Sequence, residues 1–488
     1  MKKQLLSIPG LLVCMLLSVL MITVSSCKKN SQPRPSVIIS KPVFQIGAKV
    51  KPGNISGSIK GTLLSDSVYN VTGDVIINKG DTLYVQPGAK IYVTGLYNFF
   101  VHGNFLSIGT AAKPIYFTVK NVTKLDNPTQ DPATDPAYQG LWGGILADTT
   151  SQFMIFKYTH IEFSGGKITV AQTFGTKNGG YAPSIKFTNV NGFVDVEDSW
   201  FYGCIDGGAS ISVATGQFNV MRNVFEKCGI YGTECFEGRN GTKGNIAYNL
   251  MMGACSNGIK MSNGGTLFQD DISVYNNTIL NGGFRRYDYG GAGNQGGRGG
   301  SISFEQNAKG QVYNNLMVND RIGLRIVGTG NYQGNALLIA DTAHMFYGNN
   351  YNYADSAVLT NNFYPQSFLT KPEPSDIPAP SSFLPAGYTL GAIYEGSSLV
   401  SKNNPQFVNY PLPLNLSGGA YATLDKLAYV KGFDFHLQSS SPAKGKGNTN
   451  FTITSTTIKI DPIYGATQIT PPGADIGCYQ TNGSGLTN

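Results

Sequence analysis

Short segments in which apolar and polar residues alternate recur along the middle of the chain. Five of them place one polar residue between two apolar residues, and these polar residues are Lys186, Ser212, Lys260, Ser303 and Arg325. Because successive side chains of a strand point to opposite faces, we expect these five to point outward and their apolar neighbours to point inward. The pattern predicts short strands that bury one face in a core.

A second kind of segment follows the first and contains a turn with a polar residue. Its copies lie at residues 196–201, 220–225, 246–251, 274–279 and 312–317. Aligning their polar positions gives the column Asp198, Asn223, Asn249, Asn277 and Asn315, with steps of 25, 26, 28 and 38 residues. Repeats of this length are typical of solenoids, in which side-chain amides of successive coils form a ladder of hydrogen bonds.

The two repeats together predict an all-β fold, a parallel β-helix in which each coil lays its strands beside those of the next. An up-and-down barrel or a sandwich would instead show hairpin signals about every 8–12 residues. The composition agrees, because 61 Gly residues and a charged fraction of 13% suit tight turns between strands. Insertions interrupt the coils at 121–139, 282–300 and 364–387, and solenoids often place such insertions on their binding face.

Motifs near both ends of the chain resemble those of a known superfamily. Residues 73–77, 81–91, 101–105 and 141–145 are similar to the opening coils of right-handed parallel β-helix proteins of the pectate-lyase-like superfamily, and residues 404–409 and 474–480 are similar to their closing segment. The resemblance implies a single right-handed parallel β-helix domain at 59–480. Its N-terminal capping coils would span 59–119, its central coils 141–363 and its closing segment 400–480.

The N-terminus resembles the leader of a bacterial lipoprotein of the Bacteroidetes type. Lys2 and Lys3 precede an apolar stretch that ends in Val-Ser-Ser-Cys at Cys27, similar to a lipobox. The resemblance implies a signal peptide at 1–26, a lipid on Cys27, a tether at 27–58 and a membrane as one partner. Lys28 in place of Asp favours the outer membrane, whereas the choice between its periplasmic and cell-surface sides stays open.

Charge and cysteine content narrow the remaining possibilities. The formal charge of +7 falls to +5 when Lys2 and Lys3 leave with the leader, and this mild excess excludes nucleic acid as a partner. We expect a monomer. Beyond Cys27 the chain carries five cysteines, an odd number that cannot all pair: Cys204, Cys228, Cys235, Cys255 and Cys478. Three of them end successive repeats, and we interpret Cys204, Cys228 and Cys255 as a stack of small buried hydrophobic residues rather than a disulfide framework.

The resemblance also implies where a substrate would bind. Polysaccharide lyases with this fold bind an acidic sugar through a cation and remove a proton with a nearby base. Lys260, Arg325 and Glu305 lie on or near the outward column of strands and are the candidates for catalytic residues. The Gly-rich second insertion would lie beside them, and its candidates for contact with the substrate are Arg285, Arg286, Tyr287, Asp288, Tyr289 and Arg298. Alternatively, Lys260 and Arg325 are charges on a solvated sheet face.

Three carboxylates of the first insertion are candidates for metal ligands. Asp126, Asp131 and Asp135 would supply the oxygen ligands that Ca²⁺ prefers, although their spacing differs from that of an EF-hand. A solvated loop without a metal is the alternative. The four His residues lack the spacing of zinc ligands.

We therefore expect a lipid-anchored cell-envelope protein that binds a polysaccharide. Whether it also cleaves the polysaccharide stays open at this point. A lyase is favoured over a glycoside hydrolase, because Asp270 and Asp271 lack the His- and Lys-containing motifs that accompany hydrolase carboxylates, and we expect these two residues to cap a turn. The alternative function is that of a non-catalytic surface adhesin or structural spacer.

Overall fold

The computed structural model describes residues 47–487 except 127–133, 169–173, 175–178, 206–208, 230–232, 264–267, 284–299, 321–322, 327–331, 334–335, 338, 354–403, 413–426, 457 and 459–468. The leader, Cys27, the contact candidates at 285–298, Asp131 and the third insertion lie outside the described residues.

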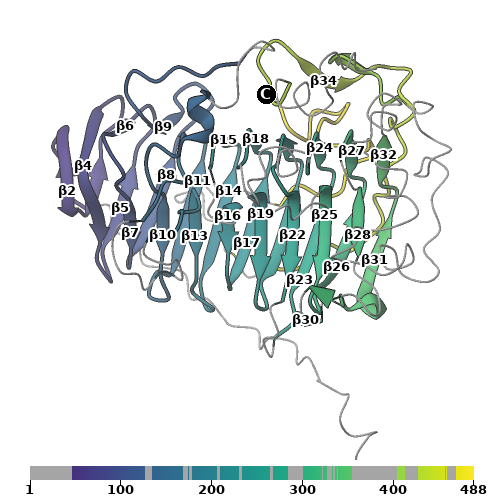
Figure 1. Ribbon diagram of the computed structural model, residues 1–488, viewed down its shortest axis with the longest axis horizontal. Helices are drawn as coiled ribbons and strands as arrows, with labels where there is room; N and C mark the ends of the chain where they lie inside the picture. The colour runs from purple at the N-terminus through teal and green to yellow at the C-terminus, as the bar shows by residue number, and fades with distance from the viewer. Residues whose placement is uncertain are drawn as a thin grey trace, which may run out of the picture.

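Most strands of the described chain belong to three parallel ladders that run along the molecule (Figure 1). Ladder one contains β2 (Gly53–Ser58), β4 (Val68–Ile77), β7 (Phe99–Val101), β10 (Ile145–Ala147), β13 (Ile185–Phe187), β16 (Ala209–Val213), β19 (Glu234–Arg239), β22 (Asn257–Ser262), β25 (Gly300–Glu305) and β28 (Leu324–Ile326). Ladder two contains β1 (Lys49–Val50), β3 (Gly61–Leu63), β5 (Thr82–Val85), β8 (Asn104–Ile108), β11 (Phe153–Lys157), β14 (Phe193–Glu197), β17 (Gln217–Met221), β20 (Lys243–Ala247), β23 (Asp271–Tyr275), β26 (Lys309–Tyr313) and β31 (Met345–Gly348). Ladder three starts at the first half of β4 and continues with β6 (Lys90–Val93), β9 (Ile115–Thr118), β12 (Thr159–Glu162), β15 (Trp200–Tyr202), β18 (Val224–Glu226), β21 (Leu250–Met252), β24 (Thr278–Leu280), β27 (Leu316–Val318) and β32 (Tyr351–Tyr353).

Each coil passes through ladder one, ladder two and ladder three before the next coil begins, as in the order β13, β14, β15 and then β16. The strands that join successive coils pair in parallel, for example β13 with β16 and β14 with β17. The all-β parallel β-helix predicted from the repeats is therefore confirmed. Its right-handed sense stays a prediction.

A few further elements complete the described fold. Two short antiparallel pairs join β29 (Tyr332–Gln333) to β30 (Ala336–Leu337) and β33 (Phe407–Asn409) to β34 (Asp434–Leu437). The 3₁₀ helices η1 (Pro136–Tyr138) and η2 (Thr342–His344) lie between strands. β1 and β2 precede residue 59, so the strands begin within the segment expected to be a tether.

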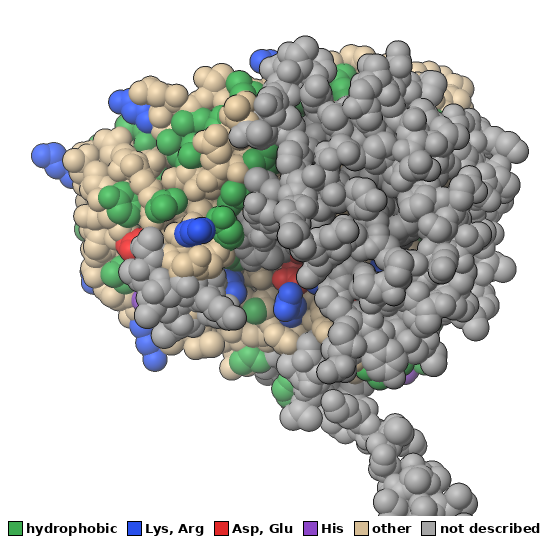
Figure 2. Space-filling model, in the orientation of Figure 1, with side chains coloured by type: hydrophobic (Ala, Val, Ile, Leu, Met, Phe, Trp, Pro, Cys, Tyr) green, Lys and Arg blue, Asp and Glu red, His purple; other side chains and the backbone are tan. Residues whose placement is uncertain are grey.

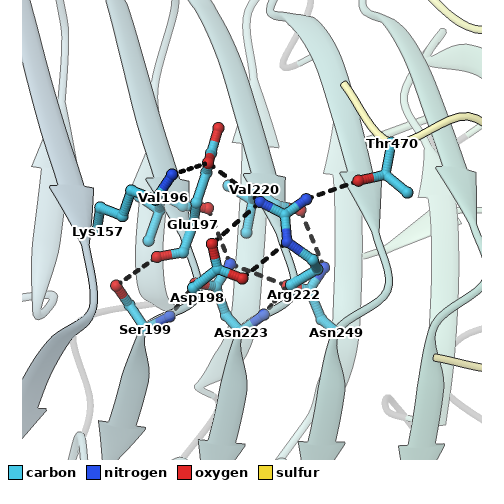
Figure 3. A network of polar contacts seen from close by, with 10 residues as sticks. All are labelled: Lys157, Val196, Glu197, Asp198, Ser199, Val220, Arg222, Asn223, Asn249 and Thr470. Carbon is cyan, nitrogen blue, oxygen red and sulfur yellow. Dashed lines mark hydrogen bonds and ion pairs between the residues drawn. The ribbon is translucent and has the colours of Figure 1, made fainter. Parts of the chain in front are cut away.

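A ladder of asparagines lines the corner between ladders two and three (Figure 3). The Nδ2 atom of Asn249 donates to Asn277 Oδ1 at 2.9 Å and to the backbone oxygen of Val220 at 3.0 Å. The same pattern continues from Asn223 to Asn350, and each of these side chains is fully buried. The predicted asparagine column is confirmed. It satisfies backbone groups that the turn leaves without strand partners.

One member of the predicted column is shifted by a residue. The strand register pairs Glu197 with Met221, which aligns Asp198 with Arg222 and Ser199 with Asn223. Accordingly, the backbone nitrogen of Ser199 donates to Asn223 Oδ1 at 3.0 Å. Asp198 and Arg222 both adopt positive φ, of 49° and 57°, because the chain turns the corner at this position.

The core consists of stacked apolar residues from successive coils. On ladder one, Ile211 pairs with Phe236, Phe236 with Ile259 and Ile259 with Ile302, and each is at most 1% exposed. Full burial of such a side chain stabilises the fold by about 1.5–3 kcal/mol. All five described cysteines are buried and none of them forms a disulfide bond. The prediction that Cys204, Cys228 and Cys255 are buried outside a disulfide framework is therefore confirmed, and Cys255 N donates to the backbone oxygen of Cys228.

The closing segment, whose described parts are 404–412, 427–456, 458 and 469–487, packs on the outside of the solenoid. Figure 1 shows it in yellow along the upper side of β24, β27 and β32. Phe435, Ile476 and Cys478 belong to one apolar cluster with residues of ladder three such as Leu316 and Tyr351. A further part of this segment lies on ladder two, where Thr454 N donates to Ser273 Oγ at 2.8 Å.

Candidate functional site

The outward residues of ladder one form a continuous polar row across six coils. In order along the molecule the row consists of Lys186, Ser212, Glu237, Lys260, Ser303 and Arg325, each paired in register with the next. Neighbouring strands lie about 4.8 Å apart, so adjacent side chains of the row reach one another. The expected position of Lys260 and Arg325, one coil on either side of Ser303, is confirmed by this register.

Three carboxylates surround the ammonium group of Lys260. Its Nζ atom lies 3.5 Å from Glu305 Oε1, 3.6 Å from Glu237 Oε1 and 3.7 Å from Glu234 Oε1. The Lys260 side chain is 17% exposed, and those of the three glutamates are at most 6% exposed. Arg239 forms a further ion pair with Glu237. We call Glu234, Glu237, Arg239, Lys260, Ser303, Glu305 and Arg325 the ladder-one cluster.

Arg325 extends the cluster into the next coil. Its Nη1 atom donates to Ser303 Oγ at 2.9 Å and to Glu305 Oε2 at 3.1 Å. The whole residue is only 5% exposed. Its Nη2 atom is buried and has no hydrogen-bond partner within the part of the chain that the structure describes. A buried N–H donor without a partner is costly, because it has lost its hydrogen bonds to water. The Nη2 atom is therefore able to donate a hydrogen bond to an oxygen atom of a ligand.

Burial and charge set the protonation states of the cluster. Burial raises the pKa of Glu234 to about 8, and Glu237 and Glu305 add to this effect against the opposing charge of Lys260. Burial alone would lower the pKa of Lys260, but the attraction of Glu305, Glu234 and Glu237 raises it above its ordinary value. At neutral pH the cluster therefore holds a protonated Glu234 and a charged Lys260.

These contacts bear on the alternative of a solvated sheet face, and the protonation states bear on the choice of a base. Arg325 is buried, Lys260 is partly buried, and both are paired with carboxylates, which differs from charges on a solvated face. Removal of either cation would leave buried carboxylates uncompensated, so we expect either change to lower the stability of the fold. The raised pKa of Lys260 also makes it a poor proton acceptor at neutral pH, which disfavours Lys260 as a base.

The cluster also contains three residues that the sequence patterns did not single out. These residues lie on β19 and are Glu234, Glu237 and Arg239. The β19 sequence Glu-Cys-Phe-Glu-Gly-Arg contains a Cys and a Gly that interrupt the usual alternation of apolar and polar residues. The coil period was the available signal, because Phe236 lies midway between Ile211 and Ile259 in the repeat.

Two of the three carboxylates suggested as calcium ligands, Asp126 and Asp135, have other partners. Asp135 accepts from Lys227 Nζ at 2.7 Å and from the backbone nitrogen of Ala137 at 2.9 Å, which occupies both of its oxygens. Asp126 accepts from the Tyr202 hydroxyl at 2.9 Å. Within the described residues no three His, Cys, Asp or Glu side chains are placed to hold a metal ion, and this geometry does not favour calcium there.

A second ionic network, at the corner that follows ladder two, has a different character (Figure 3). Arg222 Nε lies 2.7 Å from Asp198 Oδ1, its Nη2 atom lies 3.1 Å from Glu197 Oε2, and its Nη1 atom donates to Thr470 Oγ1 at 2.7 Å. The network thus ties the closing segment to the solenoid. Each of the three guanidinium nitrogens of Arg222 donates to a protein oxygen. We therefore interpret Arg222 as a structural residue, in contrast to Arg325.

Asp270 has the role expected from its sequence context. Its Oδ1 atom accepts from the backbone nitrogens of Gly241 and Thr242 at 2.8 and 2.9 Å. It therefore binds the turn between β19 and β20.

Comparison with protein-family models, with curated proteins and with solved structures gives no match to this chain. Over the described residues, none of the helices is long and apolar enough to cross a membrane.

Proposed function

We propose that this protein is a lipid-anchored cell-envelope protein that binds an acidic polysaccharide on the outer side of ladder one, at the ladder-one cluster. The observation that carries the proposal is the buried, unpartnered Nη2 donor of Arg325, beside a row of alternating charged and hydroxyl side chains. Lipid attachment at Cys27 is proposed from the lipobox-like sequence that precedes it.

The charge balance of the cluster favours an anionic ligand. With Glu234 protonated, the three cations Arg239, Lys260 and Arg325 outnumber the two other carboxyl groups of the cluster, Glu237 and Glu305. Hydrogen bonds from guanidinium or ammonium groups to carboxylates are among the strongest in proteins, and Arg can form two of them side by side. A uronic acid offers such a carboxylate together with hydroxyl groups that both donate and accept.

A repeating ligand also suits a repeating surface. The polar row spans several coils at a spacing of about 4.8 Å, so one extended chain can meet side chains of more than one coil. Ionisable groups with shifted pKa values are concentrated at functional sites in proteins, which supports this cluster over a solvated sheet face. The competing role as an adhesin or spacer requires no ligand for Arg325.

The proton chemistry of the cluster centres on glutamate. Glu234 is a buried carboxylic acid at neutral pH, and it lies near the same ammonium group as Glu237. If the bound polysaccharide is cleaved, Glu234 is the group able to donate a proton, and Lys260 is the group able to stabilise negative charge.

We predict that the affinity for polygalacturonate rises as pH falls from 9 to 6.5. The raised pKa of Glu234 means that it loses its negative charge in this range, near pH 8, while the ligand carboxylates stay ionised. Removing one charge close to the ligand corresponds to about 1 kcal/mol, or about fivefold in affinity. Titration calorimetry at several pH values measures the change.

The matched control for the pH dependence is Glu234→Gln, which keeps the shape of the side chain and removes its titration. Its affinity should stay nearly constant over this range and equal that of the unsubstituted protein at low pH. An unchanged pH dependence in Glu234→Gln would contradict the assignment of the titrating group to Glu234.

A binding panel tests the proposed function itself. The purified protein is titrated with polygalacturonate, alginate, xylan and mannan, and each mixture is followed for products of cleavage. The proposal expects binding to at least one acidic polysaccharide and weaker binding to the neutral ones. Absence of binding to every member of a wider glycan array would favour the spacer.

A further inference from the structure

The positive charge of the chain is concentrated in its first coils. Residues 47–124 contain eight Lys and no Arg, against three Asp and no Glu, which gives a net charge of +5. Residues 125–488 carry 22 basic and 26 acidic residues, which gives −4. The mild total charge therefore hides a strongly uneven distribution.

Most lysines of the first coils are exposed and have no acidic partner within the described residues. Lys60 pairs with Asp81 and Lys113 with Asp66, and Lys124 pairs with Glu162. The remaining five belong to none of the ion pairs between described residues, and four of them are exposed members of turns or strands near the N-terminal end: Lys49, Lys51, Lys79 and Lys90. The fifth, Lys120, is also exposed and follows β9.

The exposed lysines surround one end of the solenoid. They come from the first strand of ladder two, from the turns after β1 and β4, from the first residue of β6 and from the end of β9. Figure 2 shows blue side chains projecting at the left end of the molecule, where Figure 1 places β2, β4 and β6. We call residues 47–124 with these five lysines the basic end.

We propose that the basic end docks on the anionic lipid surface of the membrane that anchors the protein. The proposed lipid on Cys27 lies 20 residues before Gly47. A fully extended chain spans at most about 3.6 Å per residue, so the basic end stays within about 70 Å of the bilayer. The tether therefore lets the basic end reach the bilayer, where lysines within about a Debye length of anionic lipids are attracted to them, and several such residues together give measurable binding.

The arrangement also explains why the two charge excesses are separated along the solenoid. If the basic end lies against the membrane, the slightly acidic remainder points away from it, and the ladder-one cluster stays accessible. The inference concerns a different surface from the polysaccharide site, and it uses the lipid anchor only to place the membrane.

The test uses the full chain with Cys27→Ser, which removes the proposed lipid and leaves electrostatic attraction alone. Binding to vesicles with about 30% phosphatidylglycerol in phosphatidylcholine, which carry a negative surface potential, is compared with binding to pure phosphatidylcholine by co-sedimentation. We expect binding to the anionic vesicles only, weakened by added salt. Lys51→Glu combined with Lys79→Glu should reduce it at least tenfold.

The matched control reverses two exposed lysines in turns of the closing segment, Lys431→Glu and Lys446→Glu, for the same change in net charge. This variant should bind nearly as well as its parent. Equal loss in both variants, or equal binding to neutral vesicles, would overturn the proposal. So would displacement of the protein from the vesicles by soluble polygalacturonate, because the lysines would then serve the polysaccharide.

Labelling the unsubstituted protein with a fatty-acid analogue separates the two hypotheses. If the label is lost in Cys27→Ser and the protein does not bind vesicles, the lipid anchor is supported and the docking surface is rejected. Vesicle binding without any label on the unsubstituted protein would do the reverse.

Discussion

Replacing Asn277 with Leu is expected to lower the free energy of unfolding by about 3 kcal/mol. Asn277 is fully buried, its Nδ2 atom donates to Ile246 O at 3.0 Å and Asn315 Oδ1 at 2.9 Å, and its Oδ1 atom accepts from Asn249. Leucine is similar in size but leaves several of these groups without partners, each at a cost of about 1–3 kcal/mol. Urea denaturation followed by circular dichroism measures the difference.

The control is Asn70→Leu on β4. Asn70 is in the same type of structure, but its hydrogen bond to Asn54 is exposed to solvent. Its replacement should change the unfolding free energy by less than about 0.5 kcal/mol, as for other surface substitutions. Similar losses for Asn70→Leu and Asn277→Leu would mean that the buried ladder is not a main source of stability.

The second large effect is expected for Lys227→Met. Lys227 and Asp135 form an ion pair with both side chains fully buried, and Lys227 Nζ also donates to Leu125 O at 3.0 Å. Removing the cation leaves Asp135 as an uncompensated buried charge, which costs about 3–5 kcal/mol. The loss should appear in urea denaturation, together with faster proteolysis within the first insertion, which this pair holds to the solenoid.

A second substitution tests the cause of that loss. Asp135→Asn removes the charge but keeps an oxygen that can accept from Ala137 N, so Lys227→Met combined with Asp135→Asn should be more stable than Lys227→Met alone. By contrast, Lys113→Met breaks an exposed pair with Asp66 and should have little effect. A double variant no more stable than the single one would reject the buried charge as the cause.

The fold could be predicted from the repeats because a parallel β-helix makes the same local contacts in each coil. Asn223, Asn249 and Asn277 occupy the same position in successive coils, so their spacing alone predicts that their amides meet. Ser199 escaped this pattern because a hydroxyl replaces the amide where the ladder begins. The same periodicity predicted that Lys260 and Arg325 share one row.

The periodicity did not predict which residues surround that row. It indicates the face from which a side chain projects, but the partners of Lys260 come from β19 and β25, of which β19 departs from the pattern. Burial of the cations depends on these neighbours and not on their own segments. The Lys227–Asp135 pair joins residues 92 positions apart through an insertion, where no repeat exists to predict the contact.

The most direct test of the polysaccharide site compares two arginines by calorimetric titration with polygalacturonate. Arg325→Lys keeps the charge but loses the donor that has no partner, whereas Arg222→Lys alters a guanidinium that is paired with Asp198, Glu197 and Thr470. The account predicts at least about a tenfold loss of affinity for Arg325→Lys, as for a lost hydrogen bond to a charged group. It predicts lower stability with unchanged affinity for Arg222→Lys. Equal affinities of Arg325→Lys and the unsubstituted protein would contradict it.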